Sequence, residues 1–133
     1  MGTAFLDRKL YLPKEWAADP ERRRKAGVPG EVTFATKPEL ARQMLERAFA
    51  EGVPRRWVTG DSVCGSSPAL RRWLEEQRQP FVLAVPSNES LWAGPIWEEG
   101  HVQTAAEMAG GLPPEAFQRL SVGQGSKGER LYD

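Results

Sequence analysis

Apolar residues recur along the chain with two different periods, which predict strands and helices in alternation. In residues 3–12, Phe5 and Leu6 are followed by Leu10 and Leu12 on either side of Tyr11, and the pattern stops at Pro13, so we expect a strand there. Residues 55–60 predict a second, short strand. Residues 81–85 form a continuously apolar run, which is typical of a strand covered on both faces.

Helical spacing occupies the intervals between these strands. The clearest helix spans residues 37–51, where Thr36 and Glu39 have the spacing of a capping box. A short basic helix is expected at residues 19–25, and a further helix opens at Ser67. Helices between short strands indicate an α/β layer with the strands at 56–59 and 81–85 parallel, joined by a right-handed crossover.

The remainder of the chain has a different pattern. Residues 86–133 contain few β-branched residues and many turn signals, with two short helical patterns near 103–108 and 114–120. A strand-like segment begins at Arg130. We therefore expect a layered first part followed by a loop-rich second part.

Composition limits the chain to one core. It has 133 residues, of which Leu, Ile, Val and Phe supply only 27, so we expect a thin aliphatic core that includes Trp57 and Trp73. No run approaches the roughly 18 apolar residues of a membrane span.

The chain has a single cysteine, Cys64, and a single histidine, His101, which excludes an internal disulfide and a Cys/His zinc cluster. A cytoplasmic location without membrane contact is the simplest expectation.

The net charge of zero conceals an asymmetry. Residues 1–80 hold 15 Lys and Arg against 11 Asp and Glu, whereas residues 81–133 hold 3 against 7. A polyanion such as DNA would contact the first part, although Arg-rich helices are also common as solvated faces. The candidate phosphate contacts are Arg22, Arg23, Arg24, Arg71 and Arg72.

Asp61 is the first candidate for chemistry because it directly follows a predicted strand. Functional groups of α/β sheets lie at the carboxyl ends of strands, and a carboxylate there suits a hard cation such as Mg²⁺. An equally simple interpretation makes Asp61 a turn residue after Gly60.

Two other patterns overlap this position. Gly60, Asp61 and Ser62 are similar to the nucleophile block of serine esterases, for which His101 would be the base and Glu98 its partner. A phosphate-binding loop would need lysine where Ser66 stands, so we exclude it.

Several longer stretches, in order along the chain, resemble the central part of bacterial insertion-sequence transposases with a DDE superfamily endonuclease domain. They are LDRKLYLPKEW at 6–16, GVP at 27–29, FATKP at 34–38, WVTGD at 57–61, RRWLE at 71–75, VLAVPSN at 82–88 and KG-x-RLYD at 127–133.

The resemblance implies a partial ribonuclease H-like fold, a mixed sheet with flanking helices, over residues 1–90. Residues 91–133 would belong to a loop-rich region inserted before the third acidic residue. Asp61 matches the second of three carboxylates that hold two Mg²⁺ ions for DNA cleavage and strand transfer. Asp7 matches a structural position, and Glu98, Glu99 and Glu107 are read as surface charges.

The expected partner is therefore DNA at transposon ends. Because the first and third carboxylates of the family have no counterpart in residues 1–133, we expect a fragment that is inactive alone. The alternative is a non-catalytic remnant that binds DNA or associates with itself.

Overall fold

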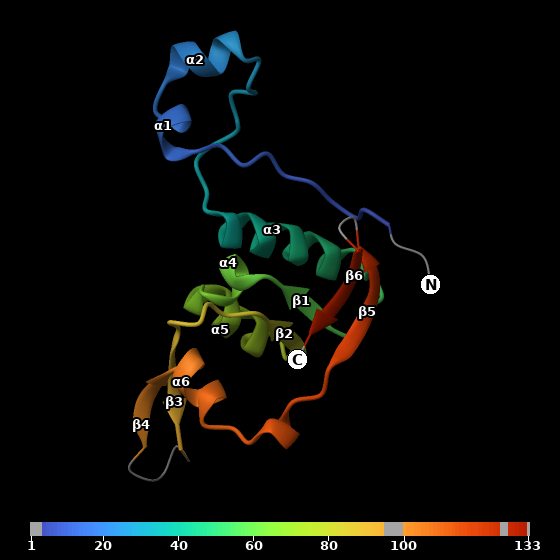
Figure 1. Ribbon diagram of the computed structural model, residues 1–133. Coiled ribbons are helices and arrows are strands. Elements are labelled where there is room, and N and C mark those ends of the chain that lie inside the picture. The colour runs from blue at the N-terminus through green and yellow to red at the C-terminus, as the bar shows by residue number, and fades with distance from the viewer. Residues whose placement is uncertain (1–3, 95–99, 126–127, 133) are drawn as a thin grey trace. The chain divides into compact units, whose positions relative to one another are not determined.

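A computed structural model describes residues 4–94, 100–125 and 128–132 of the chain. Helices and short strands alternate, as the sequence predicts for an α/β protein (Figure 1). The chain forms two compact units, Met1–Pro86 and Ser87–Asp133, which we describe separately. The predicted division after residue 90 falls inside the first strand of the second unit.

A pair of parallel strands lies at the centre of the first unit. Strand β1 (Val58–Gly60) pairs with β2 (Phe81–Leu83), with Thr59 opposite Val82. Helix α5 (Pro68–Glu76) connects them, so the predicted parallel arrangement is confirmed.

Only one face of this strand pair is covered. Val58 and Gly60 of β1 are half-buried with Phe81 and Leu83 of β2, whereas the intervening Val82 is 62% exposed. The prediction that residues 81–85 are covered on both faces is therefore wrong. An apolar strand is buried on both faces only when a second element packs against its other face.

Helix α3 (Lys37–Ala50) begins with the predicted capping box. Thr36 Oγ1 accepts a hydrogen bond from the Glu39 amide, and the Glu39 carboxylate accepts one in return from the Thr36 amide at 2.7 Å. Phe49 of α3 stacks on Trp73 of α5, with ring centroids 5.4 Å apart. This contact holds the two helices together.

Two short helices precede α3. Helix α2 (Pro20–Lys25) is the predicted basic helix, with Asp19 as its N-cap, whereas α1 (Lys14–Ala17) was not predicted. The Arg23 guanidinium donates to the carbonyl oxygens of Ala17 and Val32 and closes the loop that follows α2.

The N-terminal segment does not form the predicted strand. Residues 4–13 are extended but have no strand partner in the described part of the chain, and a strand requires one. Residues 4–10, which we call the arm, run alongside α3 (Figure 1). Asp7 of the arm accepts hydrogen bonds from the Arg47 guanidinium, and Lys9 Nζ donates to Gln43 Oε1 at 2.7 Å.

The second unit consists of small antiparallel pairs. The pattern near residues 103–108 corresponds to helix α6, whereas that near 114–120 yields only a 3₁₀ turn. The two hairpins were not predicted, apart from the strand-like start at Arg130. The elements are β3 (Ser90–Ala93), β4 (His101–Thr104), α6 (Ala105–Gly110), η1 (Pro114–Ala116), β5 (Leu120–Gly125) and β6 (Gly128–Tyr132).

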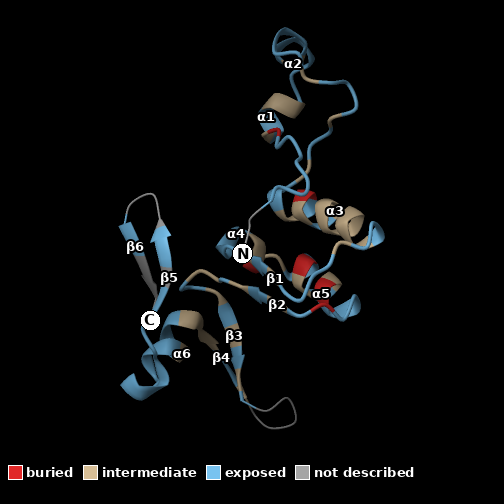
Figure 2. Cartoon of the chain, turned by 90° about the vertical axis from the view of Figure 1, so that its right-hand side faces the viewer, coloured by how far each residue is buried: buried red, intermediate tan, exposed pale blue. Residues whose placement is uncertain are grey.

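The aliphatic core is as thin as the composition predicts. The buried apolar residues in the described part of the chain are Leu12, Leu40, Leu70 and Leu74, all in the first unit (Figure 2). Trp57, which we expected in the core, directly precedes β1 and is 55% exposed, so that expectation is wrong. Among the described residues, no helix combines the length and apolar character that crossing a bilayer requires.

Candidate functional site

Asp61 lies where sequence reasoning placed it, directly after the carboxyl end of β1. Its carboxylate caps a one-turn helix, α4 (Ser62–Gly65), that the sequence did not predict. Oδ1 accepts hydrogen bonds from the amides of Val63 at 3.1 Å and Cys64 at 3.2 Å. Asp61 is exposed, and its side chain also forms a hydrogen bond with the Cys64 thiol. Asp61 can therefore be both a residue that begins a turn and a carboxylate available to a metal ion.

Two glycines allow α4 to sit against the end of the strand pair. A Cβ at Gly60 would stand 2.8 Å from Leu83 Cδ2, and a Cβ at Gly65 would stand 1.8 Å from the Ala84 carbonyl oxygen. The two glycines of this segment, which we excluded as a phosphate-binding loop, therefore have a packing role. Close packing of α4 requires glycine at position 65, where the obstacle is a backbone carbonyl group, whereas at position 60 the end of the Leu83 side chain could shift.

Arg71 supports α4 from helix α5. Its guanidinium, which is half-buried, donates a hydrogen bond to the carbonyl oxygen of Gly65. Ser66 Oγ donates to the carbonyl oxygen of Ser62 at 2.7 Å. The carbonyl groups at the end of this one-turn helix thus gain side-chain donors, which stabilise the turn that Asp61 begins.

At the opposite end of the strand pair, Gln79 is the buried polar residue that fixes the two strands. Its side-chain Nε2 donates to the carbonyl oxygens of Arg56 at 3.3 Å and Pro80 at 3.0 Å, and its Oε1 accepts from Arg55 Nε at 2.9 Å. The Arg55 guanidinium also stacks on the Phe49 ring, 3.5 Å from its centroid. These contacts set where β1 starts relative to β2.

Cys64 lies beside Asp61 and is half-buried. Burial raises the pKa of its thiol above the ordinary value, and the nearby Asp61 charge raises it further. Both effects favour the neutral thiol, so the site does not activate Cys64 as a nucleophile. Cys64 therefore acts as a small, half-buried apolar residue.

The carboxylate at residue 61 is suited to be one ligand of a hard cation. Among the described residues, no group of three or more His, Cys, Asp and Glu side chains is placed to hold a metal ion. A two-metal site requires carboxylates around ions about 3.5–4 Å apart. The described residues therefore fit one contact to a metal and do not fit a complete two-metal centre.

The five candidate arginines occupy different environments. Arg23 and Arg71 are half-buried, with their guanidinium groups on backbone carbonyl oxygens. Arg22, Arg24 and Arg72 are exposed, and the guanidinium of Arg22 lies 3.9 Å from the centroid of the Trp16 ring. The structure thus separates two residues with internal contacts from three at the surface.

The residues of the esterase interpretation fall in both units. Ser62 is exposed at the start of α4, and His101 begins strand β4, where its ring contacts the Gln103 side chain. Glu98 and Glu99 lie outside the described residues. Glu107, read as a surface charge, is exposed and caps α6 by a box with Thr104, whose hydrogen bonds lower the pKa of Glu107.

Sequence reasoning missed the residues that place Asp61. Gly65, Arg71 and the helix α4 were not assigned this role, because four residues are too few to show a helical period. The available signal was Asp61 followed by small residues and Gly65, which is compatible with an N-cap and a close helix end.

Comparison with known proteins identifies a family for the chain. No curated protein and no solved structure matches the chain. A family model described as DDE superfamily endonuclease matches residues 1–119, which include the whole first unit and Asp61. Since this match covers most of the 133 residues, the chain belongs to the DDE superfamily endonucleases.

Proposed function

We propose that the chain is a segment of an insertion-sequence transposase in which Asp61 is one of the metal-binding carboxylates. Its family consists of nucleases that act on DNA and generally use divalent metal ions. The parallel pair β1 and β2, with helices on one face, would be part of a ribonuclease H-like core. The observation that carries the proposal is the position of Asp61 at the end of β1.

Three features suit Asp61 to the metal. It is exposed, it directly follows the end of β1, and its Oδ1 is held by two amides. A carboxylate fixed in this way loses little conformational freedom on binding a cation. Mg²⁺ is the proposed ion, because it typically uses one or two protein carboxylates together with waters and phosphate oxygens.

We further propose that the chain is inactive by itself. The two ions of this chemistry would activate a water or 3′-hydroxyl and stabilise the leaving oxygen, which one carboxylate does not position. Among the described residues, Asp61 belongs to no group of three or more His, Cys, Asp and Glu side chains that could hold a metal ion. The proposed role of the chain is therefore to contribute Asp61 to a site completed by other acidic residues.

Paramagnetic broadening by Mn²⁺, followed by NMR, tests the metal role. We expect selective broadening at residues 60–64 that Mg²⁺ reverses and that Asp61→Asn abolishes. Glu76→Gln, which removes another exposed carboxylate of the first unit, is the matched control and should change nothing. Equal broadening in the Asp61→Asn protein would contradict the assignment.

A nicking assay on supercoiled DNA tests the second part separately. The purified chain with Mg²⁺ should leave the substrate intact. Cleavage that depends on Mg²⁺ and is lost in Asp61→Asn would overturn the proposal of inactivity and retain Asp61 as a ligand.

DNA contact is proposed through the exposed arginines Arg22, Arg24 and Arg72. Support comes from the excess of basic residues in positions 1–80 and from the exposure of these three side chains. The half-buried Arg23 and Arg71 donate to backbone carbonyl groups and are proposed to stabilise the fold.

A further inference from the structure

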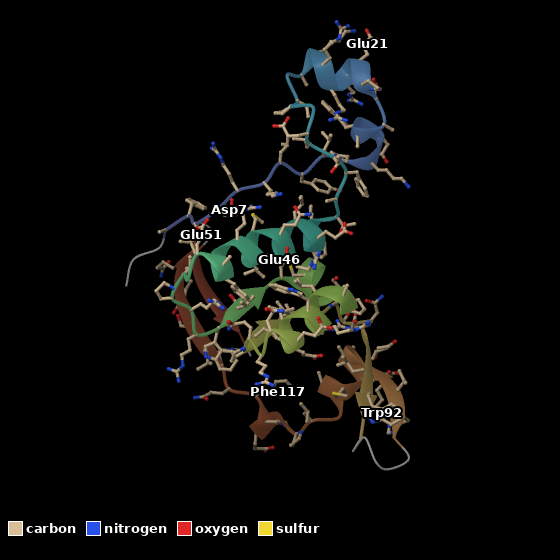
Figure 3. The ribbon with its side chains drawn as sticks, turned by 180° about the vertical axis from the view of Figure 1, so that it is seen from behind. Asp7, Glu21, Glu46, Glu51, Trp92 and Phe117 are labelled. Atoms are coloured by element: carbon tan, nitrogen blue, oxygen red, sulfur yellow. The ribbon has the colours of Figure 1, made fainter. Side chains whose placement is uncertain are left out.

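The arm presents apolar side chains to solvent. Phe5 is fully exposed, Leu6 is 69% exposed and Leu10 is 53% exposed. The backbone of the arm is extended without a strand partner in the described residues. Its contacts with α3 include polar ones, among them those of Asp7 beside the C-terminal part of the helix (Figure 3). An extended apolar segment of this kind has unpaired backbone N–H and C=O groups and can pair with another strand.

A groove of about 350 Å³ lies between the arm and β1. Its lining includes residues 4–7 of the arm and residues 58–60 of β1. Helix α3 contributes apolar side chains, from Ala41 to Ala48, and Leu83 of β2 contributes another. The arm borders this apolar space without filling it.

The groove also meets an open sheet edge. The Val58 amide donates to the Pro80 carbonyl oxygen, and the Gly60 carbonyl oxygen accepts from the Ala84 amide, each at 3.0 Å. Because alternate residues of a strand direct their backbone groups to opposite edges, Thr59 directs its own away from β2. Thr59 lines the groove, and within the described residues β1 has no neighbour on that edge. A two-stranded sheet is marginal alone and gains stability from a third strand.

We propose that a second copy of this chain fills the groove with its arm, and that the exchange is reciprocal. Each arm would lie between the arm and the β1 strand of the other copy. The resulting sheet would run in the order β2, β1, second arm, first arm, second β1, second β2. The proposal concerns self-association and does not depend on the metal or DNA role of the chain.

The sequence of the arm is complementary to itself when two copies run antiparallel. A twofold axis between Asp7 and Arg8 places Phe5 opposite Leu10 of the second copy, Asp7 opposite its Arg8 and Leu6 opposite its Lys9, so two of these three kinds of pair are complementary. Apolar and opposite-charge pairs directly across an antiparallel ladder are both stabilising. The seven residues of the arm span about 23 Å when extended, enough to pass β1 and continue along α3.

A twofold arrangement also closes the open edges. Both copies use the same surface, so the interface is isologous and the two β1 edges are covered at once. A partner without this symmetry would leave one arm exposed. A second copy is therefore the occupant that covers both the exposed arm and the groove beside it.

Sedimentation equilibrium of the full chain tests the proposal. We expect a concentration-dependent shift from the monomer mass to twice that mass. Phe5→Asp should remain monomeric throughout, with an unchanged circular dichroism spectrum and melting temperature, because Phe5 is fully exposed in the monomer. Leu112→Asp, at another exposed apolar residue, should dimerise like the original protein.

A second variant tests the register. Arg8→Glu would place like charges opposite Asp7 at two symmetric positions and should weaken the dimer by roughly tenfold, less at high salt. A chain that is monomeric at all concentrations would overturn the proposal. So would a dimer that survives Phe5→Asp, since another surface would then hold the copies together.

Discussion

Gly65 and the carbonyl oxygen of Ala84 are in such close contact that a Cβ at position 65 would stand 1.8 Å from that oxygen. This contact seats the end of α4 on the chain that leaves β2. Asp61 opens α4, so the place of its carboxylate depends on a packing contact four residues away. The candidate site is thus fixed by backbone fit as well as by the identity of the acidic residue.

Replacing Gly65 by alanine should therefore destabilise the protein. The obstacle is a backbone oxygen, which cannot rotate away, so we expect a loss of about 1–3 kcal/mol or more in the free energy of unfolding. Gly30→Ala is the matched control, because a Cβ there meets nothing within 4 Å, and its effect should stay within about 0.5 kcal/mol. Urea unfolding followed by circular dichroism measures both. Equal stabilities would show that α4 does not depend on this contact.

The arginines provide two matched comparisons for DNA binding. Arg24→Gln and Arg72→Gln should each lower the slope of log affinity against log salt by roughly one counterion, because each removes an exposed phosphate contact. Arg23→Gln and Arg71→Gln should preserve the slope and lower the melting temperature, since their guanidinium groups hold backbone carbonyl oxygens.

Fluorescence anisotropy with a short duplex across a salt series measures these slopes. The same change of slope in all four variants would remove the distinction between surface and internal arginines. Binding without any salt dependence would remove the phosphate contacts altogether.

The features that the sequence predicts correctly are those encoded locally. The capping box of α3 needs only Thr36 and Glu39, and the start of α5 needs only Ser67 and the proline after it. The parallel pairing of residues 58–60 and 81–83 follows from a helix between two short strands. The position of Asp61 at a strand end follows from the same pattern.

The features that sequence reasoning missed depend on distant residues. The arm has a strand pattern, but pairing requires a neighbour that the described residues do not provide. Trp57 lies outside β1, directly before its first residue, and is 55% exposed. The steric need for Gly65 becomes visible only when Ala84 is placed beside it. None of these relations has a signature within a short window of sequence.

Gln79 should be essential for the strand pair. Gln79→Ala would leave the Arg56 and Pro80 carbonyl oxygens without its amide, and Arg55 Nε without its acceptor. Because the Pro80 carbonyl oxygen keeps the Val58 amide and Arg55 and Arg56 are exposed, we expect the cost of lost hydrogen bonds, about 0.5–1.5 kcal/mol in the free energy of unfolding. Gln77→Ala, at an exposed position two residues earlier, should be nearly neutral. A smaller loss for Gln79→Ala than for Gln77→Ala would contradict the assignment.

The attachment of the arm should depend on pH through Asp7. The hydrogen bond from the Arg47 side chain holds the pKa of Asp7 below its ordinary value. A carboxyl group with a lowered pKa in the attached state stabilises that state above its ordinary pKa, about 3.9 for aspartate, and this contribution is lost as the pH falls through the lowered value. The arm should therefore loosen in acid, while α3 persists.

Backbone ¹⁵N relaxation of residues 4–10 measures this change. We expect the heteronuclear NOE of the arm to fall as the pH drops below the ordinary aspartate range. Asp7→Asn should show the low value at every pH, because its amide cannot form the ion pair with Arg47. Arg42→Gln, which breaks the exposed pair with Glu46 on the same helix, should keep the original pH dependence. An arm that stays rigid in Asp7→Asn would show that contacts other than the Asp7–Arg47 pair attach it to α3.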